Sequence, residues 1–355
     1  MLKSWGRVGF LDLYRPETSA ARTALVARER VLAVVPCLNE SAHINQLLSR
    51  LLDDAGDLDL MIVVADGGST DGTQDIVARI AAAEPRVRLI DNPKRIQSAG
   101  VNLAVREFGD TRRWLARIDA HAEYPQGFIA SLIAEARRTD ASSVVVAMKS
   151  EGANCFQRAA AVAQNSVLGT GGAAHRSSGA EGFVDHGHHA LFDLKRFVSV
   201  GGYNDTLSHN EDAEFDVRLA RAGGKIWLTR AVDITYFPRS HPLALYRQYV
   251  NYGRGRARTL LHHRIRPKVR QFLPACVLPT LLALVLSPWI PFMVGPAAVW
   301  SGTCLLSGVV LGIRQRRRCA FGSGIAAMII HLGWSIGFWW EIVFGRKSKT
   351  GPTPA

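Results

Sequence analysis

The chain has 355 residues, 48% of them hydrophobic, so it is long enough for one or two domains with an apolar core. It carries 43 Lys and Arg against 30 Asp and Glu, a formal net charge of +13. This balance suits nucleic acid, anionic lipid or phosphorylated substrates, or a basic protein held near a membrane by its C-terminal part. The five cysteines show neither paired nor metal-like spacing, which argues against a cysteine-based metal site. We expect them to be reduced packing residues in a protein that faces the cytosol.

The first 30 residues contain five arginines and no apolar core long enough for a signal peptide. From residue 31, short apolar runs alternate with amphipathic segments. The runs predict buried strands at 31–36, 60–66, 87–90, 114–119 and 143–148. The segments between them predict helices at about 41–53, 71–83, 98–108 and 126–138. The alternation predicts an α/β fold with a doubly wound, mostly parallel, Rossmann-like sheet, in which ligands bind at the carboxyl ends of the strands.

Beyond residue 150 the pattern is looser. A Gly- and Ala-rich segment at 169–182 predicts a mobile loop, and 209–223 predicts a helix that ends at Gly223. Residues 243–264 predict a long amphipathic helix, with an apolar side and an arginine-bearing side.

The C-terminal part is typical of a membrane protein. Residues 272–313 contain no charged side chain, are interrupted near 287–291, and are followed by the basic run 314–318. Membrane helices are predicted at about 272–290, 292–313 and 319–345. The basic segments on both sides of the first two helices predict a hairpin with cytoplasmic ends, whereas the third either crosses the bilayer or lies in its interface.

Polar side chains gather where the predicted strands end. Asp66 ends the strand before "GGSTDGT", and Asp119, His121 and Glu123 occupy every second position of "RIDAHAEYP". If the strand continued, these three side chains would share one of its faces. The glycine loop after Asp66 alone is weak evidence for phosphate binding, and the dinucleotide and Walker fingerprints are absent.

Four segments in order carry a stronger signal: "VVPCLNE" (34–40), "VVADGGSTDGT" (63–73), the strand end at Asp119, and "VGGYND…HNEDAEFDVRLARAGGKI" (200–226). In this combination, from about 31 to 230, the chain resembles the inverting family 2 glycosyltransferases of the GT-A fold. With its membrane helices it looks closest to the ExoA-like, succinoglycan-type exopolysaccharide glucosyltransferases of bacteria. The resemblance implies a basic lead-in at 1–30, a GT-A domain at 31–240, an amphipathic linker at 241–271, membrane helices at 272–345 and a tail at 346–355.

The resemblance also implies roles for individual residues. Asp212 matches the catalytic base and Glu211 its partner in the Glu-Asp pair. Asp66 matches one aspartate of the family's Asp-Asp-x-Ser loop, of which only half is present. The residues implied in binding the donor nucleotide are Pro36, Asn39, Glu40, Asp66 and Asp119, and those implied in binding a divalent cation, Mn²⁺ or Mg²⁺, are Asp119 and His121.

The chemistry fits those side chains. A leaving nucleotide diphosphate carries charge that a cation with oxygen ligands can neutralise, and a carboxylate can accept the proton of the attacking hydroxyl. One base opposite one leaving group gives inversion. His121 stands where the family has a carboxylate, and three interpretations remain open: it binds the metal, it donates to the diphosphate, or it has no function while Asp119 alone or Glu123 holds the ion.

Other polar residues allow two readings each. The histidines of "DHGHH" (185–189) indicate an acceptor-cleft lining or plain surface rather than a zinc site. Arg254, Arg256 and Arg258 suit either a diphosphate or anionic lipid headgroups. Gln248 is also a candidate acceptor contact, but the family's processive Gln-x-x-Arg-Trp motif is not completed after it, which favours addition of a single sugar.

The sequence therefore predicts a transferase of the bacterial inner membrane with its catalytic domain in the cytoplasm. It would move one hexose, glucose, from a UDP-linked donor to a lipid-linked oligosaccharide in exopolysaccharide synthesis. The first alternative is an enzyme that glycosylates a polyprenyl phosphate directly. The second, of another class, is an inactive membrane adaptor that binds nucleic acid or lipid. We expect no nucleic-acid partner, since a basic-aromatic reading surface is absent.

Overall fold

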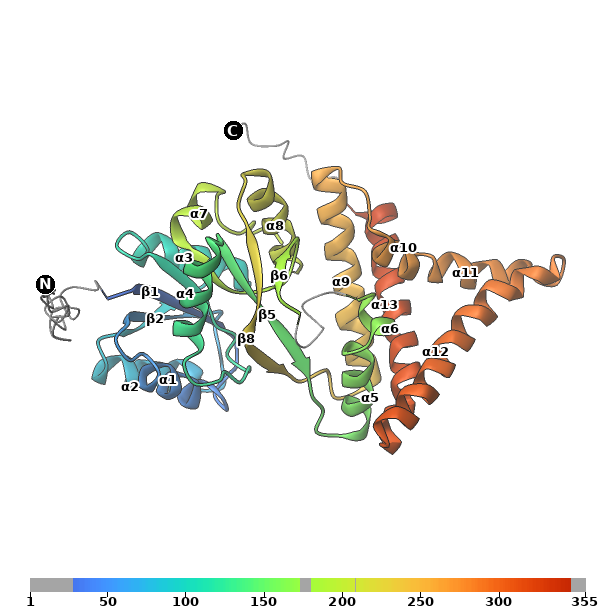
Figure 1. Ribbon diagram of the computed structural model, residues 1–355, viewed down its shortest axis with the longest axis horizontal. Helices are drawn as coiled ribbons and strands as arrows, with labels where there is room; N and C mark the ends of the chain where they lie inside the picture. The colour runs from blue at the N-terminus through green and yellow to red at the C-terminus, as the bar shows by residue number, and fades with distance from the viewer. Residues whose placement is uncertain (1–27, 173–179, 208, 346–355) are drawn as a thin grey trace, which may run out of the picture.

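The structure is a computed structural model that describes residues 28–172, 180–207 and 209–345. Three predicted segments lie wholly or partly outside these residues: most of the lead-in at 1–30, part of the loop at 169–182, and the tail at 346–355. Figure 1 shows an α/β domain on one side and a group of long helices on the other.

One mixed sheet forms the centre of the α/β domain, with strand order β3-β2-β1-β4-β7-β5-β8-β6. Its strands are β1 (Arg30–Cys37), β2 (Asp59–Asp66), β3 (Val87–Asp91), β4 (Trp114–Arg117), β5 (Ser143–Ser150), β6 (Gly182–Val184), β7 (His188–Asp193) and β8 (Ile226–Tyr236). The first four strands are parallel, as the alternating sequence predicts, and β5 is parallel to β8. The strand β7 runs antiparallel between β4 and β5, which the sequence did not indicate.

Helices cover both faces of this sheet, so the predicted doubly wound α/β fold is confirmed. One apolar cluster contains α1 (Ile44–Asp53) and α4 (Phe128–Thr139), and α2 (Thr73–Ala83) packs beside them. The other contains α3 (Gln97–Phe108), α7 (Leu194–Ser199) and α8 (Glu211–Arg221). The β-branched residues of β1 and β2 are buried between the clusters, which explains why these strands read as continuous apolar runs.

One strand is shorter than predicted. The strand β4 ends at Arg117, and the chain then turns, with the Ala122 amide donating to the Asp119 carbonyl at 3.2 Å. Asp119, His121 and Glu123 therefore do not share one face of a strand, and this expectation was wrong. The turn sends the three side chains to different neighbours.

The C-terminal helices pack against the domain through α5 (Cys155–Gln164), α6 (Val167–Thr170) and α9 (Pro242–His263). They are α10 (Val269–Ala275), α11 (Val277–Ala283), α12 (Val294–Gln315) and α13 (Ser323–Phe344), with short 3-10 turns at Leu284–Leu286, Pro291–Met293 and Arg318–Gly322. Three apolar stretches are long enough to cross a membrane: Val269–Leu286, Pro291–Gln315 and Arg318–Phe344.

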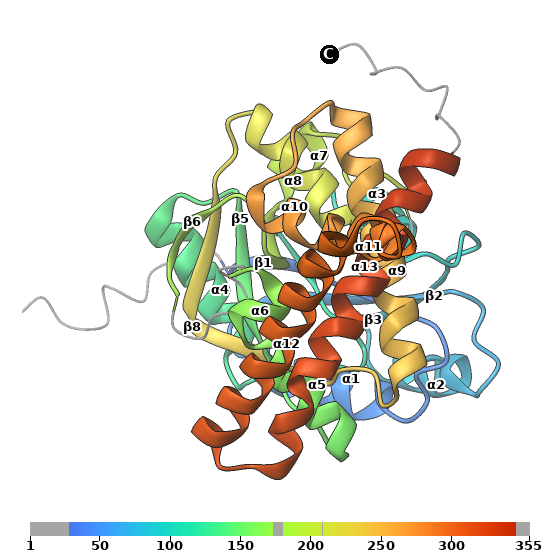
Figure 2. The ribbon, with the colours of Figure 1, turned by 90° about the vertical axis from the view of Figure 1, so that its right-hand side faces the viewer.

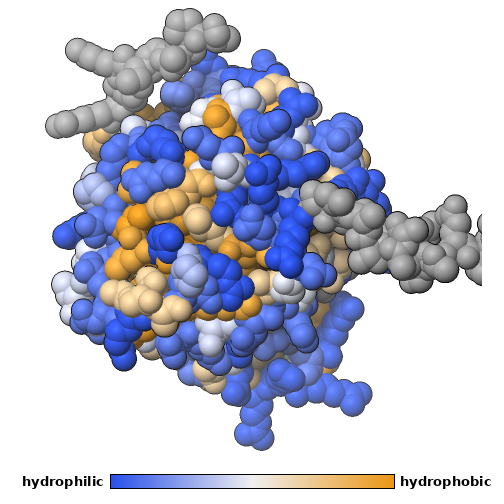
Figure 3. All heavy atoms as spheres, turned by 90° about the vertical axis from the view of Figure 1, so that its left-hand side faces the viewer, coloured by the Kyte–Doolittle hydropathy of each residue, from blue (hydrophilic) through white to orange (hydrophobic). Residues whose placement is uncertain are grey.

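These stretches are arranged differently from one another. Figures 1 and 2 show α11 and α12 extending away from the α/β domain, whereas α13 lies along α9. Gly253 of α9 sits against the backbone of Trp334, and Gly337 of α13 sits against the backbone of Val250. Because only glycine allows backbones to approach so closely, these positions fix the contact between the two helices. The opposite face of the molecule is mostly hydrophilic (Figure 3).

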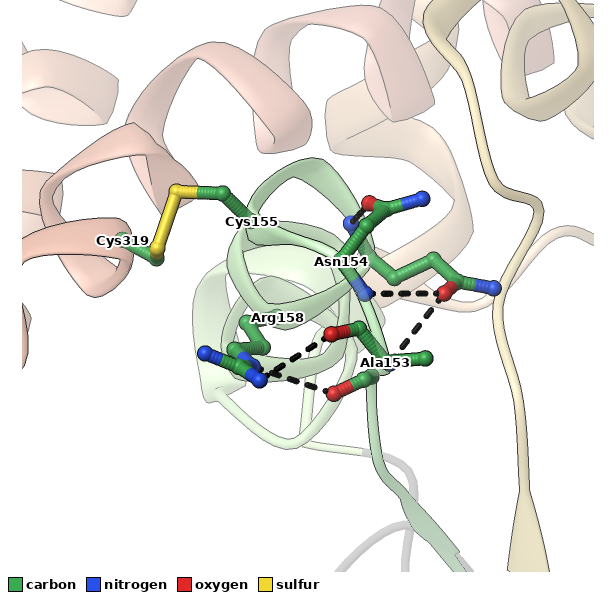
Figure 4. The surroundings of a disulfide bond; sticks show 7 residues. Ala153, Asn154, Cys155, Arg158 and Cys319 are labelled. Carbon is green, nitrogen blue, oxygen red and sulfur yellow. Dashed lines mark hydrogen bonds between the residues drawn. A yellow bond between two sulfur atoms is a disulfide. The ribbon is translucent and has the colours of Figure 1, made fainter.

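A disulfide also joins the two parts. Cys155, at the start of α5, is bonded to Cys319, in the turn between α12 and α13 (Figure 4). The expectation that all five cysteines are reduced was therefore wrong for this pair, whose members are 164 residues apart. The remaining cysteines, Cys37, Cys276 and Cys304, are free.

Candidate active site

The loops after β1 and β2 are held together at the carboxyl edge of the sheet. The Asn39 amide donates to the Ser69 hydroxyl at 2.8 Å, and the Thr70 amide donates to the Asn39 side chain at 2.9 Å. Asn39 has a φ of 58°, in the left-handed region that asparagine tolerates better than most residues. Glu40 is anchored through its amide to Thr73, which leaves its carboxylate for other contacts, while Pro36 is buried in β1.

Asp66 stabilises its own loop. One carboxylate oxygen accepts from the amides of Gly68 and Ser69, both at 2.8 Å, and from the Gln74 side chain at 2.6 Å. The other accepts from the Ser69 hydroxyl at 2.5 Å. Burial alone would raise the pKa of Asp66, but these hydrogen bonds lower it. The structure thus places Asp66 at the predicted edge, with its carboxylate committed to shaping the glycine turn.

A buried arginine connects the predicted catalytic and donor-binding acids. Arg117, the last residue of β4, donates to the Asp212 carboxylate at 2.6 Å and lies 3.9 Å from Asp119 and 4.0 Å from Glu211. The Tyr203 hydroxyl also donates to Asp212, at 2.8 Å. The side chain of Arg117 is 3% exposed, so its positive charge acts in a poorly screened environment.

The ionisation of these acids differs. Burial and the charge of Asp212 raise the pKa of Glu211 to about 7. Burial would also raise the pKa of Asp119, but Arg117 and His188 hold it well below the usual range. Glu211 and Asp212 are in the first turn of α8, where the helix dipole favours negative charge. The site therefore keeps one acid firmly ionised beside another that titrates near neutral pH.

His121 and Asp119 have separate partners. The His121 Nδ1 lies 3.0 Å from the Glu40 carboxylate, and this hydrogen bond raises the pKa of His121. Asp119 accepts from the Gln97 side chain at 2.8 Å and lies 3.4 Å from His188 Nε2. The backbone of Glu123 forms an isolated antiparallel bridge with that of Thr235. The three readings of His121 thus remain open, and Glu123 lines a second pocket together with His121.

Two groups of side chains offer atoms that could bind a divalent cation. Carboxylates from Asp119 and Glu40 together with the imidazole of His121 suit Mn²⁺, which accepts both kinds of ligand. Within the described residues, Glu214, His262 and His263 have potential metal-ligating atoms that all lie within 4.8 Å of one another. That group serves packing between α8 and α9, because Glu214 is held by Arg218 at 2.6 Å and by His263 at 2.9 Å.

A cavity of about 1360 Å³ begins at these acids and continues to the C-terminal helices. Asp119, Asp212 and Gln248 line one end, and Trp300 of α12 and Trp334 of α13 line the other. Gln248 donates to the hydroxyls of Tyr236, at 2.8 Å, and Tyr252, at 3.1 Å. His186 and His188 also line the cavity, in keeping with the cleft reading, and the side chain of His189 lies outside the described residues.

Arg254, Arg256 and Arg258, the three arginines of α9 that the sequence singled out, have different partners. Arg254 and Arg258 pair with Glu341 of α13, at 3.3 and 2.6 Å, whereas Arg256 lines the cavity. Arg254 therefore holds two helices together, and Arg256 remains available to a ligand. This distinction depends on how α13 packs, so the sequence left all three equivalent.

Sequence reasoning missed three residues that contact the predicted acids: Gln97, Arg117 and Tyr203. For Arg117 a signal existed, because a charged residue inside the apolar run "WLARID" requires buried partners. Tyr203 belongs to the "GGYND" segment that carried the resemblance. Gln97 is brought in by α3, and no local pattern marks it. His188 was predicted as a cleft residue, but its contact with Asp119 was not.

The fold and these strand-end acids together define a glycosyltransferase of the GT-A type. The structure is similar to that of a mannosyltransferase from Pyrobaculum calidifontis in complex with GDP-Man and Mn²⁺, with a TM-score of 0.56, 17% identity, and coverage of 89% of this chain and 88% of that one. The profile of glycosyl transferase family 2 matches residues 32–195. The chain is also 46% identical over 316 residues to the succinoglycan biosynthesis protein ExoA of Rhizobium meliloti (strain 1021), covering 89% of this chain and 96% of that protein. It therefore belongs to the family 2 glycosyltransferases, within the ExoA-like group.

Proposed function

We propose that this enzyme is bound to the bacterial inner membrane and transfers one hexose, glucose, from UDP-glucose to a lipid-linked oligosaccharide in exopolysaccharide synthesis. The name of the relative from Rhizobium meliloti supports the pathway. The observation that carries the proposal is the single cavity that runs from the strand-end acids to the apolar helices. An acceptor with a sugar end and a lipid end matches both ends of this cavity.

On the donor side, Pro36, Asn39, Glu40 and Asp66 form the edge that receives the nucleotide. The loops are preorganised by the bonds of Asn39 with Ser69 and Thr70, so binding orders few further groups. Asp66 acts by holding the glycine turn in shape. Asp119 and His121 would hold a divalent cation, with Glu40 nearby. When bound, the cation neutralises charge on the departing diphosphate.

On the acceptor side, Asp212 accepts the proton of the attacking hydroxyl. The hydroxyl oxygen forms a bond to the anomeric carbon as the bond from that carbon to the diphosphate breaks, so the configuration inverts. Arg117 and Tyr203 fix the orientation of the Asp212 carboxylate. Glu211, beside it, supplies a second negative charge that depends on pH. Gln248 donates to two tyrosine hydroxyls. The positions after it carry Asn251 and Tyr252 in place of the processive Arg-Trp pair, which supports addition of one sugar.

In the membrane, α11 and α12 form the hairpin with both ends on the catalytic side. The third apolar stretch, α13, lies in the interface, because it packs along α9 and carries the buried Glu341 that binds Arg254 and Arg258. A carboxylate with two basic partners is better accommodated beside the domain than in the bilayer centre. The proposed side of the membrane is the cytoplasmic one, because basic segments flank the hairpin. The catalytic domain would then lie beside membrane lipids.

The test is transfer of labelled sugar from UDP-, GDP- and dTDP-linked donors into the lipid-extractable fraction by purified protein, with and without Mn²⁺. We expect UDP-glucose with Mn²⁺ to be the productive combination, and Asp212→Asn to lose about 10²- to 10⁴-fold in turnover. Activity that survives exhaustive chelation would refute the metal assignment, and full activity of Asp212→Asn would refute the base.

The main alternative acceptor, a polyprenyl phosphate, is separated by competition. A lipid-linked oligosaccharide should outcompete polyprenyl monophosphate for labelled sugar. His121→Asp provides a further comparison, because a change in preference between Mg²⁺ and Mn²⁺ shows that the imidazole touches the ion. An unchanged preference and turnover would return His121 to a neighbouring role.

A further inference from the structure

The charge of Arg239 acts on His121, and Arg239 is one of three arginines in the wall of the cavity. Arg239, Arg256 and Arg270 all line it. Across the described residues, Arg239 and Arg256 have no hydrogen bond or ion pair with protein groups. Arg270 lies 3.8 Å from Asp185, which also pairs with Lys268. Positive charge is therefore concentrated here beyond what the acids of the protein neutralise.

Arg256 and Arg270 are half-buried, whereas Arg239 is exposed. Burial and the neighbouring charge of Arg270 lower the pKa of Arg256 to about 10, which leaves it charged at neutral pH. The acid whose charge acts on it is Asp216, and that carboxylate already contacts His186 at 2.6 Å. Burying a charge without a hydrogen-bonded partner is unfavourable, so an anionic ligand would relieve this arrangement.

The position of Arg256 separates it from the donor acids. Its neighbour Gly255 packs against His209 and Asn210, directly before Glu211 and Asp212 at the start of α8. Arg256 and Asp212 thus line the same cavity where α9 packs on the start of α8, whereas the pair of His121 and Glu40 belongs to the donor side. An anion held by Arg256 would be part of the acceptor.

The wall of the cavity turns apolar beyond the arginines. It is formed by Leu273 of α10, Val277 of α11, Val299 and Trp300 of α12, and Ile330 and Trp334 of α13. Leu273 and Val299 are 66% and 70% exposed, so they offer free apolar surface. A hydrocarbon chain attached to the anion can follow this wall into the region of the apolar helices.

We propose that Arg256 and Arg270 bind the diphosphate of a polyprenyl-linked acceptor, whose hydrocarbon chain lies along the wall formed by α10 to α13. This inference rests on the proposed function and names the site that holds its acceptor. Two guanidinium groups suit a diphosphate because each presents a planar fork of donors to phosphate oxygens. The arrangement places the sugar end of the acceptor at Asp212 and its lipid end toward the membrane.

The test measures binding rather than transfer. The full chain in a phosphate-free neutral detergent is first saturated with UDP and Mn²⁺ to occupy the donor site, and its thermal unfolding is then followed as farnesyl diphosphate is added. We expect stabilisation of the wild type and an affinity lower by about 10- to 100-fold in Arg256→Gln, and also lower in Arg270→Gln. Arg247→Gln removes an exposed arginine of the same helix outside the cavity and should bind like the wild type.

Further ligands identify what is recognised. Farnesol should stabilise weakly and inorganic diphosphate weakly, since each offers only half of the ligand. Wild-type affinity in Arg256→Gln would overturn the proposal, as would phosphatidylglycerol that displaces farnesyl diphosphate at equal concentration, because the site would then be a general headgroup site. If no nucleotide binds but farnesyl diphosphate binding depends on Arg256, the proposed function fails and this site stands.

Discussion

Replacing Arg117 by methionine should move the acid limb of the pH–activity profile upward by about 1–3 pH units. The Arg117 guanidinium lies 3.9 Å from Asp119 and 4.0 Å from Glu211, and it donates to Asp212. At these separations and an effective dielectric constant of about 20, each charge pair is worth about 4 kcal/mol, or about 3 pKa units before relaxation. Without the arginine, the pKa values of Asp119 and Glu211 rise, so the ionised site forms only at higher pH.

The assay is sugar transfer by purified Arg117→Met, Arg117→Lys and wild-type enzyme between pH 5 and 9. Removal of one partner from a buried ion pair costs about 3–5 kcal/mol of stability, so the lysine variant, which retains the charge, serves as the control if the methionine variant unfolds. The lysine variant should show a smaller shift. An acid limb at the same pH in Arg117→Met and the wild type would refute the electrostatic role of Arg117, as would a shift in Arg117→Lys as large as that in Arg117→Met.

Three other predictions concern stability and covalent structure. Because the pKa of Glu211 is raised, the wild type should lose up to about 3 kcal/mol of stability as the pH rises from about 4.5 to about 7. The melting temperature of Glu211→Gln should therefore rise relative to that of the wild type over this range, and a constant difference would contradict this. Glu341→Gln leaves two partly exposed arginines of α9 unpaired and should lower stability by about 1–3 kcal/mol in detergent. The surface control Glu84→Gln should have little effect. Equal melting curves for the two variants would show that the ion pairs of Glu341 do not hold α13 to α9. Mass spectrometry of an unreduced digest should detect a peptide pair joined through Cys155 and Cys319, and free thiols at both positions would contradict the structure.

The sequence predicted most of the α/β framework because its signals are local. The apolar runs of β1 and β2 are buried on both faces, and such runs identify a parallel strand without knowledge of its partners. The antiparallel β7 was missed because "DHGHHALFD" begins with polar residues that reach into the site instead of solvent. Its pairing with β4 and β5 depends on contacts far along the chain.

The predicted site residues come to one edge of the sheet, but their partners could not be read from the sequence. Asp119 and His121 were expected on one strand face, and the turn after Arg117 sends them to His188 and to Glu40 instead. Arg254 and Arg256 looked equivalent on an amphipathic helix, and only the packing of α13 distinguishes them. The cysteines gave no spacing signal because the bonded pair connects separate parts of the fold.

In the proposed mechanism, Asp119 binds the donor nucleotide and its cation, whereas Asp212 is the catalytic base. These two roles are tested most directly by measuring nucleotide affinity and turnover on the same samples. The measurement titrates UDP in the presence of Mn²⁺ into wild type, Asp119→Asn and Asp212→Asn, and compares sugar transfer. We expect Asp212→Asn to bind UDP and Mn²⁺ as the wild type does while losing about 10²- to 10⁴-fold in turnover, and Asp119→Asn to lose affinity. Retained turnover in Asp212→Asn, or unchanged nucleotide affinity in Asp119→Asn, would contradict the proposed roles.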